Sequence, residues 1–146
     1  MLFLFIGVVS KGKLMKQLTD LLLALKTVLT QYHLLAQDYQ NHLQAERIGS
    51  DLDEIIDRCK EFYLGIDGDE DIAYSKKSLE GALAIISALP PDNTPKEWAT
   101  HLLARGITLC EQFNVNGYPK RAAENLIGDI SEKLCRMRYL INLGDK

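Results

Sequence analysis

The chain has 146 residues, of which 47% are hydrophobic and 25% are charged, and its formal net charge is −3. This length fits one domain with a sizeable core, and the composition is that of an ordinary globular protein. The slightly negative charge provides no general attraction to nucleic acid or to anionic membranes.

An apolar run over residues 2–9 opens the chain and is followed by Lys11 and Lys13. It is much too short to span a bilayer, which takes about 20 residues, and the lysines stand on the wrong side for a secretory signal. We interpret residues 1–13 as an apolar N-terminal extension that docks on the domain or precedes a natural start at Met15. Weak attachment to a membrane or a partner is a further alternative. Residues 14–146 form the predicted domain.

Apolar residues then recur every seven positions in three neighbouring series, the first of which is Leu14, Leu21, Val28 and Leu35. Together they form a wide apolar stripe, which is typical of a helix buried along its length. We predict one long N-terminal helix over about residues 14–47, with Gly49 as its C-terminal cap. This helix would be the spine of the domain.

Four further helices are predicted, over about residues 50–64, 70–89, 95–113 and 119–143. Ser50 is the expected N-cap of the first of them, and Pro90 ends the second. Thr94 and Glu97 form a capping-box pattern at the start of the third. The sequence therefore predicts an all-α, single-domain bundle of about five helices.

The apolar positions of these helices are expected to be buried, including Leu79 and Leu83. The three cysteines, Cys59, Cys110 and Cys135, also fall on apolar positions of the predicted helices. An odd number without close spacing favours buried thiols in a reduced, cytoplasmic protein.

Three of the predicted helices contain an interior glycine, namely Gly81, Gly106 and Gly128. A glycine within a helix costs about 1 kcal/mol relative to alanine. Close approach of two helix backbones is one reason to tolerate that cost, and an undemanding surface position is the alternative.

Two groups of residues partly match metal-binding patterns. Asp67, Asp69 and Asp71 fit the first, third and fifth positions of a calcium loop, but Ile72 and Ser78 replace the glycine and the glutamate that the loop requires.

Asp38, His42 and Glu46 share a helix face, at a spacing that can present metal ligands together. Nothing else in the chain supplies a matching second cluster. We therefore predict no metal and no other cofactor.

Tyr32, Tyr39 and Trp98 are candidates for the lining of a small-molecule pocket within the bundle. The hydroxyl groups of buried tyrosines need hydrogen-bond partners, which a ligand could supply. In the alternative interpretation, the tyrosines lie at the edge of the core with their hydroxyl groups in water.

The chain is strongly acidic between residues 51 and 71, whereas its last predicted helix is rich in basic residues. Five acidic side chains are candidates for a surface that docks a basic partner: Asp51, Asp53, Glu54, Asp57 and Glu61. Alternatively, the acidic helix packs near the basic one, within one molecule or between two.

No catalytic triad, glycine-rich phosphate loop or paired zinc motif is present in the sequence. The sequence therefore favours an intracellular protein that acts by protein–protein interaction rather than an enzyme. A second copy of the chain, forming a homodimer, is one candidate partner; nucleic acid is not expected, nor is a transmembrane segment. The alternative is a small-molecule-binding bundle, or an enzyme with an unrecognised site.

Overall fold

The computed structural model describes residues 11–35, 39–67, 71–115 and 117–143. They form five α-helices, which are α2 (Lys11–Leu35), α3 (Tyr39–Asp67), α4 (Asp71–Ser87), α5 (Pro95–Gln112) and α6 (Lys120–Leu143). The predicted all-α bundle is confirmed. Most of the predicted N-terminal extension, residues 1–10, lies outside the described residues, and residues 11–13 already belong to α2. No helix of the described part is both long and apolar enough to cross a membrane.

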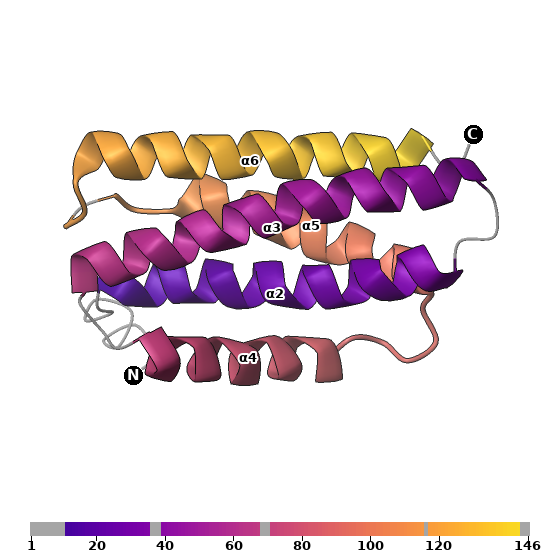
Figure 1. Ribbon diagram of the computed structural model, residues 1–146, viewed down its shortest axis with the longest axis horizontal. Coiled ribbons are helices and arrows are strands. Elements are labelled where there is room, and N and C mark those ends of the chain that lie inside the picture. Colours follow the sequence, from indigo (N-terminus) through magenta and orange to yellow (C-terminus); the bar gives the residue numbers. More distant parts are fainter. Residues whose placement is uncertain (1–10, 36–38, 68–70, 116, 144–146) are drawn as a thin grey trace.

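The predicted spine over residues 14–47 is wrong, because its residues are divided between two helices. α2 ends at Leu35 and α3 begins at Tyr39, and the two helices lie side by side (Figure 1). The heptad pattern concealed the break because its apolar series continue on both sides of it. Heptad spacing records which face of a helix is apolar, and an antiparallel neighbour can carry the same spacing onward.

The predicted helix end at Gly49 is also wrong, since α3 continues through Gly49 and Ser50. Gly49 does not have the positive φ that a glycine cap adopts. Ile48 and Leu52, on either side of the glycine, are completely buried. Their packing holds the helix together across a residue of low helix propensity.

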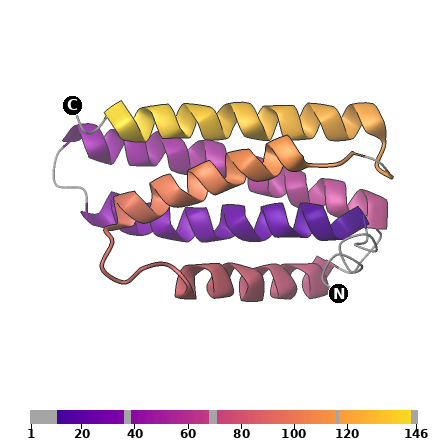
Figure 2. The same ribbon diagram turned by 180° about the vertical axis from the view of Figure 1, so that it is seen from behind.

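Four of the helices form a ring. α2 packs against α3 and α5, and α6 packs against the same two helices, so the order around the ring is α2, α3, α6, α5 (Figure 1). Seen from behind, α5 runs obliquely, close to α2 at its start and close to α6 at its end (Figure 2). The core of the protein lies inside this ring.

The contacts between side chains fix the direction of each helix. Lys26 of α2 pairs with Asp53 of α3, and residues 33 and 46 line one cavity, so α2 and α3 are antiparallel. Glu54 and Arg58 of α3 pair with Lys133 and Asp129 of α6, so these two helices are also antiparallel. α5 is antiparallel to both α2 and α6 (Figure 2). α3 and α5 therefore run in the same direction.

α4 lies outside the ring, where it packs against α2 (Figures 1 and 2). Since α3 and α5 run in the same direction, the chain must return along the bundle between them, and α4 makes that return. The α4 face toward α2 buries Ser78 and Ala82. Leu79 and Leu83, which the sequence analysis expected to be buried, are 63% and 64% exposed.

The interior glycines of α4 and α5 mark close contacts between helices. A β-carbon on Gly106 would lie 2.9 Å from Leu21 Cδ2 and 3.0 Å from Leu134 Cδ1, so the glycine lets α5 approach both neighbours. A β-carbon on Gly81 would overlap the carboxylate of Asp20. Gly128, in contrast, has no such neighbour within 4 Å, and its surface interpretation is confirmed.

The start of α5 confirms the capping box predicted from the sequence. Thr94 Oγ1 accepts a hydrogen bond from Glu97 N, and Glu97 Oε1 accepts one from Thr94 N. The indole Nε1 of Trp98 donates to the carbonyl oxygen of Pro90 at 2.6 Å. These bonds fix the segment between α4 and α5 to the first turn of α5.

Candidate functional site

The first candidate site is a groove at the place where α2, the end of α4 and the start of α5 meet. We call it the Trp98 groove. It has a volume of about 480 Å³, and it is lined by Thr27, Val28, Gln31, Ile86, Leu89, Pro95 and Trp98. None of these residues carries a charge. The amphipathic helix α2 supplies one wall, while the Pro90–Trp98 hydrogen bond holds the opposite wall in place.

The polar groups of the Trp98 groove are mostly occupied within the protein. Thr27 Oγ1 donates to the carbonyl oxygen of Leu23 at 3.0 Å, and the indole N–H of Trp98 is bonded to Pro90. Gln31 is exposed, and its side-chain amide makes no hydrogen bond among the described residues. The groove therefore offers an aromatic ring, aliphatic side chains and one amide.

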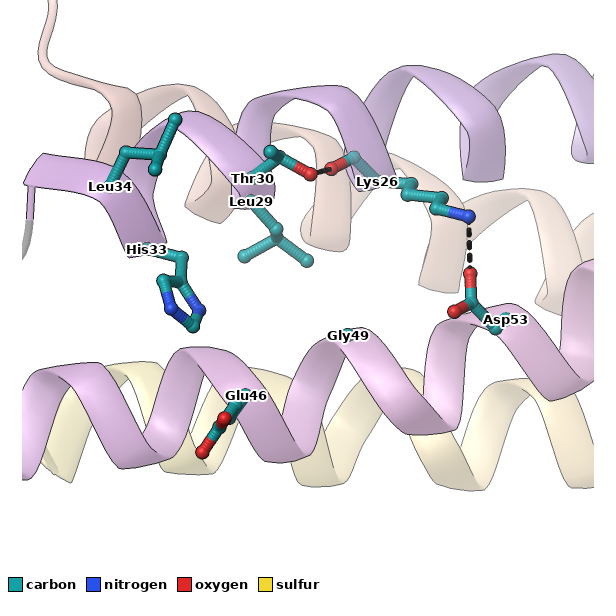
Figure 3. A pocket seen from close by; sticks show the side chains of 8 residues that line it. All are labelled: Lys26, Leu29, Thr30, His33, Leu34, Glu46, Gly49 and Asp53. Atoms are coloured by element: carbon teal, nitrogen blue, oxygen red, sulfur yellow. Dashed lines mark hydrogen bonds and ion pairs between the residues drawn. The ribbon is translucent and has the colours of Figure 1, made fainter.

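A second cavity, of about 310 Å³, lies between α2 and α3 (Figure 3). Its residues are Lys26, Leu29, Thr30, His33, Leu34, Glu46, Gly49 and Asp53. Lys26 Nζ and Asp53 Oδ1, which both line the cavity, form an ion pair at 2.5 Å that joins α2 to α3 (Figure 3). Gly49 leaves the floor open, since no side chain lies within 4 Å of where its β-carbon would be.

The charges of this second cavity are largely exposed. The side chains of Lys26 and Asp53 are 49% and 58% exposed, and exposed ion pairs contribute only about 0–1 kcal/mol. The imidazole of His33 points into the cavity, whereas the carboxylate of Glu46 points away from it (Figure 3). This divergence gives the cavity no convergent set of ligands or catalytic groups.

The structure does not test the group of Asp38, His42 and Glu46, which partly matched a metal-binding pattern in the sequence. Glu46 is exposed on α3, and the side chains of Asp38 and His42 lie outside the described part of the structure. Within the described residues, no group of three His, Cys, Asp or Glu side chains could hold a metal ion.

The predicted pocket residues are placed on three helices. Tyr32 is buried on α2 but is not among the residues that line the Trp98 groove. The side chain of Tyr39 on α3 is not described. Of the two residues whose side chains are described, Trp98 lines the groove and Tyr32 does not, and the pocket as predicted remains untested.

The acidic candidates share α3, and two of them pair within the molecule. Asp53 binds Lys26 of α2, and Glu54 Oε2 lies 2.8 Å from Lys133 Nζ of α6. The hydrogen bond from Lys133 lowers the pKa of Glu54. The acidic and basic helices thus pack within one molecule, as one of the two alternatives predicted.

Three of the acidic candidates take no part in these ion pairs. Asp57 and Glu61 are exposed and Asp51 is half-buried. Among the described residues, none of the three forms an ion pair. A docking role for this stretch remains a prediction.

The cysteines offer no activated nucleophile in the core. Burial raises the pKa of Cys59 to about 12, and Cys110 nearby contributes to the shift. Burial likewise raises the pKa of Cys110 to about 12. Both thiols are free and protonated at neutral pH, and therefore unreactive. Cys135, expected to be buried, is exposed on α6.

Sequence reasoning missed Asp20, a buried carboxylate at the contact between α2 and α4. Asp20 Oδ2 pairs with Lys16 Nζ at 2.7 Å, while Asp20 Oδ1 and the neighbouring Ser78 Oγ are buried and outside hydrogen-bond geometry. Burial raises the pKa of Asp20, and the hydrogen bond and charge of Lys16 partly oppose the shift. The sequence carries no signal of this burial, because Asp20 lies outside the three apolar series and its position predicts an exposed side chain.

Comparison of the chain with protein-family models, with curated proteins and with solved structures finds no match. The geometry of the described residues is therefore the basis for a functional proposal.

Proposed function

We propose that this protein acts by protein–protein interaction, and that the outer face of α4 is the surface it uses. The observation that carries the proposal is the exposure of Leu79 and Leu83, at 63% and 64%. They lie four residues apart and are therefore neighbours on the helix surface. Covering one leucine side chain contributes about 1.5–3 kcal/mol, which makes this pair a favourable contact for a partner.

The outer face of α4 also carries one charge of each sign. Lys76 lies three residues before Leu79 and Glu80 lies three residues before Leu83; both are exposed and lie on the same side of the helix as the leucines. We take the complementary partner to be a different protein that presents an amphipathic helix with two apolar residues one turn apart, an acidic residue that meets Lys76 and a basic residue that meets Glu80.

A photo-crosslinking experiment in the native cell tests this proposal. The photoreactive residue p-benzoylphenylalanine replaces Leu83 in one variant and Ala104 in a control variant, since Ala104 is exposed on α5. We expect one dominant crosslinked protein from position 83 and none from position 104. The additional substitution Leu79→Glu should remove the crosslink, because it places a charge within the apolar contact.

Two outcomes would contradict the proposal. Equal crosslinking from positions 83 and 104 would mean that α4 makes no specific contact, and an absence of crosslinks from position 83 would mean that its leucines simply face water. A crosslinked species of twice the chain mass would show that the partner is a second copy of the chain and not a different protein. Circular dichroism of each variant confirms that the helices are retained.

A further inference from the structure

We propose that the Trp98 groove binds a small, uncharged, mostly apolar molecule with an aromatic or aliphatic body. This site is distinct from the outer face of α4 and does not depend on the proposed protein contact. Its volume of about 480 Å³ falls within the range of about 300–1,000 Å³ that is typical of small-molecule sites.

The lining determines the class of ligand. The seven residues come from three segments of the chain, and none of them is acidic or basic. A charged group in this groove would lose water without meeting an opposite charge, which is unfavourable. An uncharged molecule loses little favourable hydration when it enters the groove, and the side chains of Trp98, Ile86 and Leu89 supply apolar contacts.

The hydrogen bonds of the groove also favour an apolar body. Thr27 Oγ1 and Trp98 Nε1 already donate to the backbone, at 3.0 Å and 2.6 Å. A water molecule in the interior of the groove would find few partners, whereas a stable buried water typically makes about three hydrogen bonds. Gln31 lines the groove and is exposed, so the ligand can carry one polar group that bonds to its amide.

Trp98 provides a direct measurement, because it is the single tryptophan of the chain. The probe is N-phenyl-1-naphthylamine, which is neutral and apolar and fluoresces in apolar surroundings. Its charged counterpart is 1-anilinonaphthalene-8-sulfonate, which has the same aromatic body with a sulfonate added. We expect saturable quenching of Trp98 by the neutral probe, with an affinity at least about tenfold higher than that of the sulfonate.

Three variants locate the bound probe. Leu89→Asp places a carboxylate in the lining and should weaken binding of the neutral probe by at least about tenfold. Gln31→Glu also places a carboxylate in the lining, at an exposed position that tolerates substitution, and should likewise weaken binding of the neutral probe. Leu83→Asp is the matched control, since Leu83 is a leucine of α4 that does not line the groove; its affinity should equal that of the unmodified protein.

The proposal fails if the neutral probe does not quench Trp98 in a saturable manner, or if the sulfonate binds equally well. It also fails if binding is lost in Leu83→Asp and retained in Leu89→Asp, because the probe would then occupy the outer face of α4. If Leu89→Asp unfolds the protein, as circular dichroism would show, Gln31→Glu decides the outcome.

Discussion

Asp20 is a carboxylate in a helix contact that is otherwise formed by small and apolar residues. Asp20 is only 7% exposed, and the absence of a side chain at Gly81 makes room for its carboxylate. Two positively charged side chains lie around it: Lys16 forms the ion pair, and Arg105 of α5 lines the same small cavity. The pKa of Asp20 is nevertheless raised, because the cost of burial exceeds the help from Lys16.

The raised pKa gives Asp20 a predictable effect on stability. Below the ordinary pKa of 3.8 the carboxyl is protonated in both folded and unfolded protein, and it carries no charge penalty. As the pH rises through the raised pKa, the folded protein must ionise a buried group, and stability is lost. The variant Asp20→Asn has no such loss, so its stability relative to the unmodified protein should increase with pH.

Urea denaturation at a series of pH values between about 3.5 and 7 measures this difference in unfolding free energy. A difference that stays constant with pH would show that the folded and unfolded pKa values of Asp20 are equal. If the unfolding free energy of Asp20→Asn falls relative to that of the unmodified protein as the pH rises, the Lys16 ion pair outweighs the cost of burial.

Among the helices, local signals were readable from the sequence and tertiary ones were not. The start of α5 was predictable because Thr94 and Glu97 bond within one turn of chain. The division between α2 and α3 was not, since no glycine or proline marks residues 36–38. Periodicity also could not show which apolar side of α4 meets α2. It therefore predicted wrongly that Leu79 and Leu83 are buried. The Trp98 groove is formed by distant segments, so its seven-residue lining was beyond sequence reasoning.

Alanine at two glycine positions tests the helix boundaries and the helix contact. Gly49→Ala should raise the unfolding free energy by up to about 1 kcal/mol, because α3 is continuous there and no atom opposes a β-carbon. Gly81→Ala should lower it, because the new methyl group overlaps the Asp20 carboxylate. Urea denaturation measures both changes. A loss of stability in Gly49→Ala would instead support a helix end at that glycine.

At the scale of the whole molecule, the ring of α2, α3, α5 and α6 is more firmly held than α4. Each ring helix packs against two others in the ring, whereas α4 packs mainly against α2. Among its described side chains, α4 buries Ser78 and Ala82, both of which are small. Such an element opens at a lower free energy than the core of its protein.

Hydrogen exchange should therefore separate α4 from the ring. We expect the amides of residues 76–87 to exchange through an opening of lower free energy than those at the centres of α2, α5 and α6, as measured by mass spectrometry. The control variant Leu102→Ala removes a completely buried side chain from the ring and costs about 2–5 kcal/mol. This variant should lower the opening free energies of the ring amides and so bring them closer to those of the α4 amides. Equal opening free energies in the unmodified protein would contradict this picture.

The parallel course of α3 and α5 has a consequence for how the chain is tied together. By connectivity, the molecule consists of two helical hairpins, α2–α3 and α5–α6, and the segment that contains α4 is their covalent tether. The tether keeps each hairpin at a high effective concentration near the other. If the chain were cut in that segment, the same ring would have to form by the meeting of two molecules, and its stability would depend on protein concentration.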